Sequence, residues 1–594
     1  MEMEQLVNLT IDNKQVQVAK GTTILKAAAS IGIKIPTLCY YELKGQGIEN
    51  KPGCCRVCVV EVEGKGNLAP ACATNVSEGM VVKTHSLKVV NARRTVVELM
   101  LSDHPASCLT CAKSGKCELQ TLAQELGIRD ITFKGEQSTY RKDLSPAIIR
   151  DVNKCIMCRR CETVCNKLQT VGALSAVNRG FMAVVATAFE QDLAKSPCVM
   201  CGQCVQACPV GALAEVDHTR QVINALNDPK KTVVVQTAPA VRVAIGEEFG
   251  LTPGTRVTGK MAAALRRIGF DYVFDTDFAA DLTIMEEGTE MLGRIDKYMK
   301  GDKSVKLPIM TSCCPGWVNF FETYYPDMLD IPSTAKSPMQ MFGAVAKSYW
   351  VEKLGIKRED MVVVSIMPCV AKKFECQRDE FKTDGNPDVD YSLTTRELAE
   401  LIKQFNIDFN SLPDEDFDNP LGASTGAAVI FGATGGVIEA ATRTAYELFT
   451  GKTLEKVDFN ELRGMDGVRE ATVDFNGTPI HIGIAHGLGN ARKLLDKVKE
   501  GKEFFHAIEV MACPGGCVGG AGQPYHHGDF TKVERRFAAI YEEDKDKPLR
   551  KSHENPYIQQ LYKEYLGEPC GEKSHHLLHT HYFDKSDKVE FVKE

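Results

Sequence analysis

The sequence predicts several domains, in which small α+β modules rich in cysteine precede a large α/β domain. Three observations lead to this prediction. At roughly 150 residues per domain, the length of 594 residues suggests about four domains. Most of the 23 cysteines lie before residue 220, in clustered spacings. From residue 231 on, apolar runs rich in β-branched residues alternate with helical patterns, which is typical of buried parallel strands joined by helices.

The composition excludes several classes of protein. It is 44% hydrophobic and 25% charged, as in soluble globular proteins, and the net charge of −7 gives no reason to expect a nucleic-acid partner. No apolar run approaches the ~18–20 residues of a membrane span, and the N-terminus lacks the regions of a secretion signal. We therefore expect a cytoplasmic protein without a membrane span. Clustered cysteines in such a chain bind metals more often than they form disulfides.

One module, predicted over residues 142–225, contains the spacing C-x2-C-x2-C-x3-C twice. This is the pattern of bacterial-type ferredoxins with two [4Fe–4S] clusters, in which the fourth cysteine of each run binds the other cluster. Eight cysteines so spaced fit two clusters better than two zinc knuckles, whose ligands need longer gaps. The predicted ligand sets are Cys155, Cys158, Cys161 and Cys208, and Cys198, Cys201, Cys204 and Cys165.

Residues 1–80 are predicted to form a β-rich module around another set of cysteines. "QLVNLTIDNKQVQV" and "CVVEVEG" read as strands, and "GTTILKAAASIG" between them reads as a helix. The set suits a [2Fe–2S] cluster on a plant-type ferredoxin β-grasp fold, although fifteen residues between its first two members exceed the plant-type C-x4-C gap. Zinc is the alternative metal. Cys54 competes for one position, and the C-x2-C spacing favours Cys39, Cys55, Cys58 and Cys72.

Residues 81–141 contain the spacing H-x3-C-x2-C-x5-C. One histidine and three cysteines would also suit structural zinc. The position between two iron–sulfur modules favours a further [4Fe–4S] relay cluster, with the ligands His104, Cys108, Cys111 and Cys117. Its histidine ligand is expected to raise the reduction potential, as in Rieske centres. The histidines of "SHHLLHTHY" near the C-terminus have no such cysteine set, and we expect them to be surface or packing residues.

The large domain, predicted over residues 226–530, has cysteines at the ends of several expected strands. These strands are "KTVVVQTAPAV", "LPIMTSCCPGW", "MVVVSIMPC", "AAVIFGATGG", "PIHIGIAHG" and "AIEVMACPGG". Ligands of parallel α/β domains bind at the carboxyl ends of strands. We therefore expect a buried metal site where these ends meet, with the candidate residues Cys313, Cys314, Cys369, Cys513 and Cys517.

Two glycine-rich stretches only weakly resemble nucleotide-binding turns. "IGIAHGLGNARKLL" contains G-x-G-x-A, but Glu509, about twenty residues on, falls inside the next expected strand instead of at its end. A tight turn in an α/β domain is enough to explain this stretch. "FGATGGV" lacks the lysine of a phosphate loop. We expect no dinucleotide site in this chain.

Three stretches, "TSCCPGW", "MPCVAKKFE" and "EVMACPGGCVGGAGQP", closely resemble the signature motifs of [FeFe]-hydrogenases. The resemblance covers nearly the whole chain, since the N-terminal modules match multi-cluster members, and "EPCGEKSHHLLHTHYF" in residues 531–594 resembles the family's small helical subunit segment. It implies the enzymatic interconversion of H₂ with protons and electrons. The implied cofactor is the H-cluster, a [4Fe–4S] cube joined through one cysteine to a two-iron unit with CO, cyanide and a bridging dithiolate amine. By motif match, the cube's ligands would be Cys314, Cys369, Cys513 and the bridging Cys517.

The resemblance also implies a path for protons. Cys313 would be the relay thiol beside the open iron position, and Pro315 is well placed to start a helix after it. A thiol at a helix N-terminus near a metal can have a lowered pKa and exchange protons; an inert packing cysteine is the alternative. "LTIMEEGTEMLGRI" is predicted to be a helix, whose acidic face could also be merely solvated. The family's path would run through Cys313, Glu287, Ser333, Glu290 and Arg294.

Further residues match family positions around the two-iron unit. Lys372 would donate a hydrogen bond to a cyanide, with Glu375 one turn beyond it if "VAKKFE" is helical. Pro239, Met367 and Met511 would surround the unit. Ala240 stands where the best-known members carry a serine that donates to a cyanide, and Met339 where many carry glutamine. The alanine recurs in subunits of multimeric NAD(P)-linked and electron-bifurcating hydrogenases.

The alanine at position 240 favours a hetero-oligomer that contains a flavin- and NAD(P)-binding subunit and a [2Fe–2S] subunit. Ferredoxin would be a further electron partner. Electrons would travel along one [2Fe–2S] and three [4Fe–4S] relay clusters. The alternatives are a stand-alone, ferredoxin-coupled H₂-evolving enzyme, an H₂ sensor, and a non-catalytic electron-transfer subunit like that of respiratory complex I. A non-catalytic electron-transfer subunit would not need the three motifs, and an H₂ sensor typically lacks a thiol at the position of Cys313. The roles of Cys54, Cys376 and Cys570 stay open.

Overall fold

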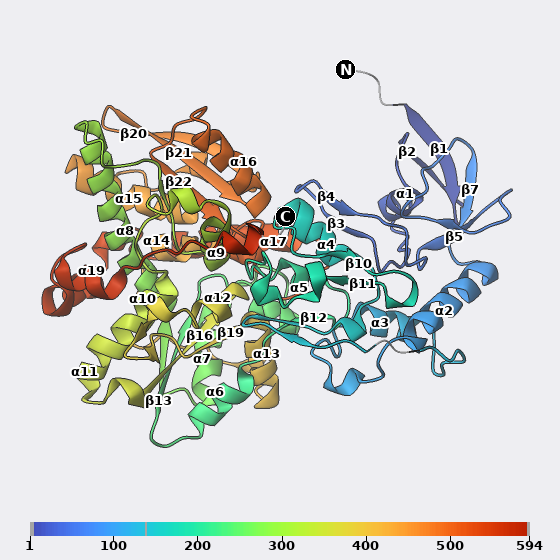
Figure 1. Cartoon of the computed structure of the whole chain (residues 1–594), viewed down its shortest axis with the longest axis horizontal. Coiled ribbons are helices and arrows are strands. Elements are labelled where there is room, and N and C mark those ends of the chain that lie inside the picture. The colour runs from blue at the N-terminus through green and yellow to red at the C-terminus, as the bar shows by residue number, and fades with distance from the viewer. Residues whose placement is uncertain (1–4, 137–138, 591–594) are drawn as a thin grey trace.

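The computed structural model describes residues 5–136 and 139–590 of the chain. Figure 1 shows the N-terminal modules at one end of the molecule, in blue to cyan, and the large domain at the other end. The two parts are in contact along the dicluster module, the region predicted to hold two clusters. This arrangement places the cysteine-rich sequence directly against the domain that carries the three motifs.

The first module is a five-stranded sheet in the order β2-β1-β7-β5-β6. β1 runs antiparallel to β2 and parallel to β7. The helix predicted from "GTTILKAAASIG" is α1, which begins where the Thr23 side chain accepts a hydrogen bond from the Lys26 N–H. The elements are β1 (Leu6–Ile11), β2 (Lys14–Ala19), α1 (Ile24–Ser30), β5 (Val59–Val62), β6 (Ala69–Pro70) and β7 (Met80–Lys83), with the separate hairpin β3 (Tyr41–Leu43) and β4 (Ile48–Asn50).

Two small modules follow. The histidine-containing one has α2 (Leu87–Ser102) and α3 (Glu118–Glu125). The dicluster module has two short helices, each lying within a cysteine run, and a three-stranded sheet in the order β12-β9-β8. Its elements are β8 (Asp143–Leu144), β9 (Ile148–Arg150), α4 (Arg160–Thr163), β10 (Ser175–Val177), β11 (Val184–Ala186), α5 (Gln203–Ala207) and β12 (Leu213–Glu215).

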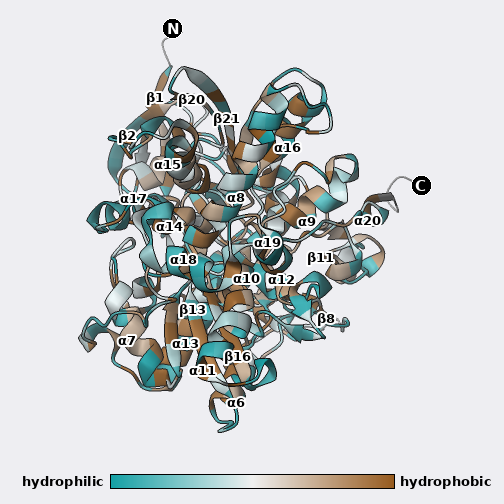
Figure 2. Cartoon of the chain, turned by 90° about the vertical axis from the view of Figure 1, so that its left-hand side faces the viewer, coloured by the Kyte–Doolittle hydropathy of each residue, from teal (hydrophilic) through white to brown (hydrophobic). Residues whose placement is uncertain are grey.

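The large domain contains two four-stranded sheets. The first, β14-β13-β16-β19, is parallel throughout. In the second, β15-β22-β21-β20, the strands are parallel except for the edge strand β20. Figure 2 shows the hydrophobic colour around β13 and β16, which are almost fully buried, as continuous apolar runs predict. The strands are β13 (Thr232–Thr237), β14 (Tyr272–Asp275), β15 (Ile309–Met310), β16 (Met361–Met367), β19 (Tyr391–Thr394), β20 (Val468–Phe475), β21 (Thr478–His486) and β22 (Ala507–Met511).

One expected strand is wrong. "AAVIFGATGG" forms α14 (Gly426–Val429) and a 3₁₀ turn (Ile430–Gly432). A short apolar run fits a fully buried helix as well as a buried strand, so its periodicity could not decide between them. The segment packs closely on the C-terminal part of the chain, since a Cβ at Gly426 would collide with Asp544.

Helices cover both sheets and carry the residues of the predicted site. α8 follows β14 and α9 begins at Pro315, both as predicted from the sequence. The helices of the large domain are α6 (Thr219–Leu226), α7 (Thr258–Ile268), α8 (Thr276–Met299), α9 (Pro315–Tyr324), α10 (Pro338–Val345), α11 (Val351–Leu354), α12 (Ala371–Glu375), α13 (Thr395–Gln404), α15 (Gly436–Thr450) and α16 (Leu488–Lys499).

The C-terminal segment is helical, as expected, and contains α17 (Thr531–Asp546), α18 (Pro556–Leu561), α19 (Glu572–Leu578) and α20 (Asp587–Glu590). It packs back on the large domain, with contacts from α18 and α19 to α8 and α10. Among the described residues, no helix combines the length and apolar character needed to cross a membrane.

The glycine-rich turn "HGLGNA" packs against protein and does not form a nucleotide site. Gly487 has a positive φ of 78° where β21 turns into α16. A Cβ at Gly489 would lie 2.8 Å from the Leu168 carbonyl oxygen of the dicluster module. Glu509 accepts hydrogen bonds from the Gly435 and Ile438 N–H groups at the start of α15, at 2.6 and 2.9 Å. Both glycines and this carboxylate therefore have structural roles.

We predict that Gly489→Ala weakens the contact between the dicluster module and the large domain. The added methyl group overlaps a backbone oxygen that cannot move alone, and overpacking of this kind costs about 1–3 kcal/mol. The apparent melting temperature of the holoenzyme, compared at one scan rate, should fall, whereas Asn490→Ala serves as the neighbouring control. An unchanged melting temperature would contradict the packing role.

Candidate active site

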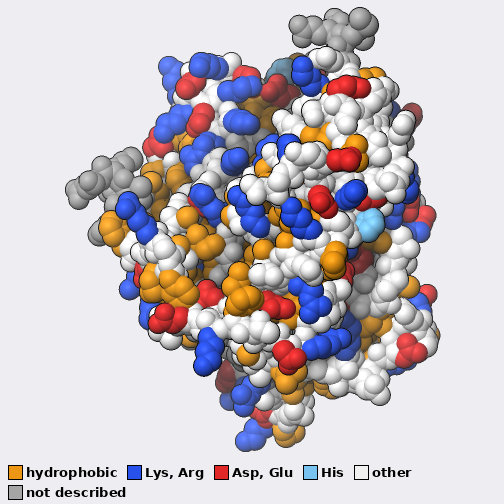
Figure 3. All heavy atoms as spheres, turned by 90° about the vertical axis from the view of Figure 1, so that its right-hand side faces the viewer, with side chains coloured by type: hydrophobic (Ala, Val, Ile, Leu, Met, Phe, Trp, Pro, Cys, Tyr) orange, Lys and Arg blue, Asp and Glu red, His pale blue; other side chains and the backbone are white. Residues whose placement is uncertain are grey.

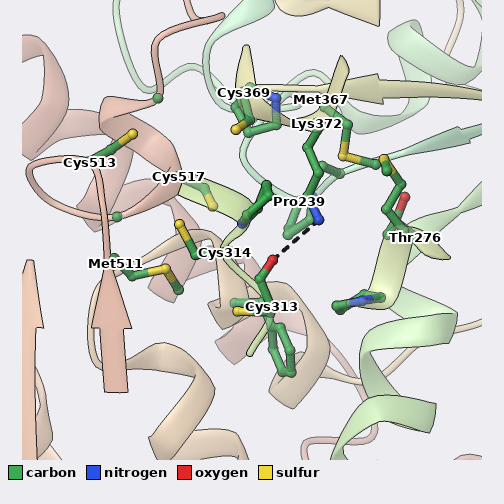
Figure 4. A pocket seen from close by; sticks show the side chains of 18 of the residues that line it. Pro239, Thr276, Cys313, Cys314, Met367, Cys369, Lys372, Met511, Cys513 and Cys517 are labelled. Carbon is green, nitrogen blue, oxygen red and sulfur yellow. Dashed lines mark hydrogen bonds between the residues drawn. The ribbon is translucent and has the colours of Figure 1, made fainter. Parts of the chain in front are cut away.

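A buried cavity lies between the two sheets of the large domain. The chain segments that follow β13, β15, β16 and β22 line it, so carboxyl ends of strands from both sheets meet there, as parallel α/β architecture predicts. Figure 4 shows this cavity with its cysteine, methionine and lysine side chains. The three motifs, which are far apart in the sequence, therefore converge on one buried space.

Four cysteines place their sulfur atoms around a common part of this cavity (Figure 4). They are Cys314, Cys369, Cys513 and Cys517. Burial raises the pKa of each thiol, to about 12 for Cys369, and nearby thiols raise the pKa of Cys369, Cys513 and Cys517 further. Four thiolates so close together without water would repel one another, and a bound cationic centre removes this cost. The set therefore fits a metal cluster.

Cys313 lines the same cavity, but its side chain points away from the four cysteines (Figure 4). Burial raises the pKa of this thiol, and the neighbouring Glu287 raises it further. This differs from the lowered pKa expected at a helix N-terminus, because the desolvation of a charged thiolate outweighs the helix dipole in a dry site. The thiol therefore keeps its proton at neutral pH and can donate it.

Lys372, on the predicted helix α12, extends its side chain into the cavity. Its Nζ donates hydrogen bonds to Glu375 Oε2 at 2.7 Å, Ser337 Oγ at 2.8 Å and the Cys313 carbonyl oxygen at 3.2 Å. Burial opposes the charge, but the Glu375 carboxylate outweighs it and raises the pKa of Lys372 above its usual value. A cation fixed in this way can donate a hydrogen bond to an anionic ligand.

The remaining wall is apolar. Pro239, Met339, Met367 and Met511 line the cavity, together with Thr276, which the sequence did not single out. Ala240 does not line it. This residue is fully buried behind the wall, and its carbonyl oxygen accepts a hydrogen bond of 2.8 Å from Gln523 Nε2.

Glu287 on α8 is the first acidic side chain near Cys313. It is 5% exposed, and its carboxyl group lies near the Ser312 backbone and the Ser333 hydroxyl. Burial raises its pKa to about 8, with a further contribution from Glu290. The alternative of a merely solvated face therefore does not hold for this position, and the carboxyl is protonated at neutral pH.

From Glu290 a continuous row of hydrogen bonds leads toward the surface. Ser333 Oγ donates to Glu290 Oε2 at 2.7 Å, and Arg294 Nη2 donates to Glu290 Oε1 at 2.6 Å. The side chains of Glu290 and Arg294 are 13% and 19% exposed. The structure thus brings together all residues of the predicted path, from a buried thiol to a partly exposed guanidinium group.

The dicluster module brings its cysteines together in the crossed arrangement that the repeat predicts. One cavity is lined by Cys155, Cys158, Cys161 and Cys208, and another by Cys165, Cys198, Cys201 and Cys204. The second lies next to the active-site cavity, because a Cβ at Gly316 would be 3.4 Å from the Cys201 Cβ.

Both N-terminal modules contact the first of these two cavities. The histidine set His104, Cys108, Cys111 and Cys117 lines a cavity of its own, and Cys111 Sγ packs against Gly211, three residues after Cys208. In the first module, hydrogen bonds from Cys54, Cys55 and Cys72 lower the pKa of Cys39. Cys54 is exposed and also donates to the Met157 carbonyl oxygen at 3.4 Å, whereas Cys55 is buried.

Comparisons with known proteins agree with this geometry. The chain matches the family "Iron only hydrogenase large subunit, C-terminal domain" over residues 231–521 and "Iron hydrogenase small subunit" over residues 531–585. It is 66% identical over 98% of its length to the NADP-reducing hydrogenase subunit HndD of Solidesulfovibrio fructosivorans, covering 99% of that protein. The chain belongs to the [FeFe]-hydrogenases. This enzyme is also 38% identical, over 97% of its length, to Iron hydrogenase 1 of Clostridium pasteurianum, 99% of which is covered.

The N-terminal part of this [FeFe]-hydrogenase matches three iron–sulfur families. They are a 2Fe-2S iron-sulfur cluster binding domain at residues 4–86, the NADH-ubiquinone oxidoreductase-G iron-sulfur binding region at 93–132, and a 4Fe-4S dicluster domain at 153–212. A solved structure of the [FeFe]-hydrogenase HydA1 from Chlamydomonas reinhardtii matches with a TM-score of 0.56 and 44% identity, over 62% of this chain and 99% of the other. The resemblance recognised from the three motifs is confirmed.

The site fits the H-cluster of this family in three respects. It has four buried thiols around one space, a lysine cation aimed into that space, and an apolar wall with three methionines that can pack around a bound group. The enzyme therefore uses [2Fe–2S] and [4Fe–4S] clusters together with an H-cluster.

Sequence reasoning missed the roles of Thr334, His579 and Glu286. His579 was expected to be a surface or packing residue, but it is buried and bonded to the other two. The bonds join residues 245 and 293 positions apart, so no local spacing could reveal them.

The pKa of about 8 predicts an observable proton on Glu287. An infrared band of a protonated carboxyl should be present at pH 6, disappear as the pH passes about 8, and be absent from Glu287→Gln at every pH. The folded chain keeps this proton, whereas the unfolded chain releases it near 4.5, so this group's contribution to stability falls as pH rises between these values. Glu290→Gln is the control that keeps the band; its absence from the wild type at pH 6 would contradict the protonated state.

Proposed function

We propose that this [FeFe]-hydrogenase is the H₂-converting subunit of an NAD(P)-linked assembly, running 2H⁺ + 2e⁻ ⇌ H₂. The observation that carries the proposal is the match, along almost the full length, to an NADP-reducing hydrogenase subunit. The expected assembly contains a flavin- and NAD(P)-binding subunit and a [2Fe–2S] subunit. Electron bifurcation, with ferredoxin as the second electron partner, is the mode of action that we favour. The expected cytoplasmic location belongs to the same proposal.

The proposed relay contains one [2Fe–2S] and three [4Fe–4S] clusters. The β-grasp arrangement of the first module, with a parallel β1–β7 pair and α1 across the sheet, supports a plant-type [2Fe–2S] domain held by Cys39, Cys55, Cys58 and Cys72. The two crossed cysteine sets support a bacterial-type ferredoxin. The histidine set supplies the remaining cluster.

Contacts between the ligand sets support a route for electrons. The first module reaches the Cys155 set through the bond from Cys54 to Met157, and the histidine module reaches it through Cys111 and Gly211. The Cys198 set then lies between that point and the active-site cavity, where Cys201 approaches Gly316. Two entry modules therefore converge on one line toward the H-cluster.

The surface of these modules supports a docking role. Figure 3 views the molecule from their side and shows hydrophobic side chains among lysines and arginines. Leu109 lies between two ligands of the histidine set and is 97% exposed, and Leu87 is also exposed. An apolar side chain fully in water beside a relay cluster is consistent with a surface that a partner subunit covers.

The protein's part in the mechanism is to hold and move protons in a dry cavity. When bound, the H-cluster supplies the open iron position at which H₂ is formed or split. The Cys313 thiol keeps its proton at this position because burial disfavours the thiolate. Glu287 exchanges that proton because its pKa of about 8 lies near neutral pH, where proton transfer in either direction costs little. Ser333, Glu290 and Arg294 then connect it to solvent.

Lys372 completes the proposed site. Its three N–H donors are all used in the structure, and the longest of these hydrogen bonds, 3.2 Å to the Cys313 carbonyl oxygen, is the one that would be exchanged for a hydrogen bond to a cyanide of the two-iron unit. Cys314, Cys369, Cys513 and the bridging Cys517 would hold the cube. Pro239, Met367 and Met511 line the cavity with apolar surface that excludes water, while Ala240 acts only through the packing behind this wall.

The main alternative is a stand-alone enzyme coupled to ferredoxin. This alternative is supported by the match to Iron hydrogenase 1 along almost the full length, because the same clusters could pass electrons to one soluble electron carrier. An H₂ sensor is disfavoured by the retained Cys313 thiol, and an electron-transfer subunit by the complete cavity.

Cys313→Ser should keep the clusters but lose most activity. A serine hydroxyl has a pKa far above that of free cysteine, which is about 8.5, and is a poor relay at neutral pH. Infrared bands of CO and cyanide should remain, which separates a lost relay from a lost cofactor. Near-wild-type H₂ evolution in this variant would refute the relay assignment.

Glu287→Gln should lower turnover by about 100-fold or more, the scale of losing a proton-transfer group. The amide keeps the size of the side chain but carries no exchangeable acidic proton. Reduction of the relay clusters by dithionite should be unchanged. A loss within about twofold would favour a structural role for this residue.

The isolated, matured chain should reduce a viologen dye with H₂ but should not reduce NAD⁺ or NADP⁺. Among the described residues, the glycine-rich turn "HGLGNA" is occupied by packing contacts, and "FGATGGV" lacks the lysine of a phosphate loop. Parallel assays with viologen, ferredoxin and both nucleotides test this expectation. Nucleotide reduction by the chain alone would refute the partner requirement, and recovery from the native host without a flavoprotein would favour the ferredoxin-coupled alternative.

A further inference from the structure

A second row of hydrogen bonds leaves the proposed proton path at Glu290. Thr334 donates to Glu290 through its backbone N–H, at 3.1 Å to Oε2, and its Oγ1 lies 3.4 Å from Oε1. The same Oγ1 lies 2.7 Å from His579 Nδ1. On the other side of the ring, His579 Nε2 lies 3.0 Å from Glu286 Oε2. Three links therefore join the carboxyl groups of Glu290 and Glu286.

The far end of this row is closed off from water. Glu286 is fully buried on α8, and His579, just after α19, is 7% exposed. The Tyr562 hydroxyl and the Cys570 N–H donate to Glu286. Its carboxylate thus lies under the C-terminal segment, whereas its neighbour Glu287 lies near enough to Cys313 to raise the pKa of that thiol.

The hydrogen bonds fit one consistent arrangement of protons. If the Thr334 hydroxyl donates to His579 Nδ1, the neutral ring carries its hydrogen on Nε2, where Glu286 accepts it. Thr334 Oγ1 then has a lone pair left, which can accept from Glu290 at the moment when the relay delivers a proton to that carboxyl group. Each group in the row has both a donor and an acceptor side, which is the requirement for a proton wire.

We propose that the proton path forks at Glu290 and that Thr334 and His579 carry protons from there to Glu286. This inference rests on the proposed relay and extends it into the C-terminal segment. Glu286 then acts as a proton store one step away from the path. Thr334 and His579 are positioning and relay residues that do not touch the H-cluster.

The transfer balances without any other reactant. The Glu290 carboxyl gives its hydrogen to Thr334 Oγ1 while the Thr334 hydroxyl hydrogen passes to His579 Nδ1. His579 then releases the hydrogen of Nε2 to Glu286. The net change is one proton moved from Glu290 to Glu286, and no electrons move. The return of the proton reverses each step and thereby restores the first tautomer of the ring.

The test compares Thr334→Val with Thr334→Ser in the holoenzyme. Valine has nearly the shape of threonine but no hydroxyl, whereas serine keeps the hydroxyl. We expect Thr334→Val and His579→Gln each to lower H₂ turnover about 3- to 10-fold and to raise the solvent deuterium isotope effect. Thr334→Ser should stay within about twofold of the wild type. Because both residues act in one row, the double variant should lose no more than the worse single variant.

Controls separate this branch from the main path and from simple destabilisation. His575→Gln, an exposed histidine stacked on His579, should leave turnover unchanged, and the CO and cyanide bands should persist in all variants. Glu290→Gln is measured in parallel: if it too is fully active, the relay itself has failed. If Glu290→Gln is inactive but Thr334→Val has wild-type turnover and isotope effect, the fork is refuted.

One more outcome would overturn the proposal. The ligand atoms of Glu286, Cys570 and His579 lie within 4.8 Å of one another, close enough to bind a cation. Zinc content is therefore measured in the purified enzyme and in His579→Gln. Stoichiometric zinc that is lost in this variant would show a metal site, because a bound cation would occupy the atoms that the proton wire needs. Absence of zinc, together with the isotope effects above, supports the fork.

Discussion

The whole molecule depends on the burial of four thiols around one cavity. Charged sulfur atoms at this depth are unstable without a cationic centre, and the raised pKa values of Cys369 and its neighbours express that cost. The fold provides for a cationic centre by directing the ends of strands from two sheets to the same point. The cysteines follow these ends, so the backbone fixes their positions before any cluster binds. This constraint explains why the three motifs are separated in sequence but joined in space.

A cavity that is dry enough for such a cluster is also closed to protons and electrons. Electrons can cross only where another ligand set comes close, and Cys201 beside Gly316 is that point. Protons need side chains whose pKa values lie near neutral pH, and burial supplies one by raising the pKa of Glu287 to about 8. The same desolvation that demands a metal at the cysteines therefore also adjusts the acid beside them.

The sequence predicted what depends on short spacings. Cysteine intervals indicated the cluster modules, the proline after Cys314 indicated the start of α9, and strand ends indicated the cavity. Family resemblance supplied the order of the proton path, which spacing alone could not. The expected strand at "AAVIFGATGG" was wrong because a short apolar run fits two buried structures equally well. The contacts of His579 could not be predicted from the sequence for another reason. They join distant parts of the chain, and a lone histidine has no periodic pattern.

The C-terminal segment helps to hold the proton path in place. Tyr582 donates to the carbonyl oxygen of Ser333, whose hydroxyl donates to Glu290. Lys585 binds Asn319 and Glu322 on α9, the helix that begins directly after the active-site cysteines. Both contacts come from the stretch that follows α19, so this stretch fixes the loop of Ser333 and the helix behind Cys314 relative to each other. A relay works only if its gaps stay constant within tenths of an ångström, and a segment bound at both places keeps them so.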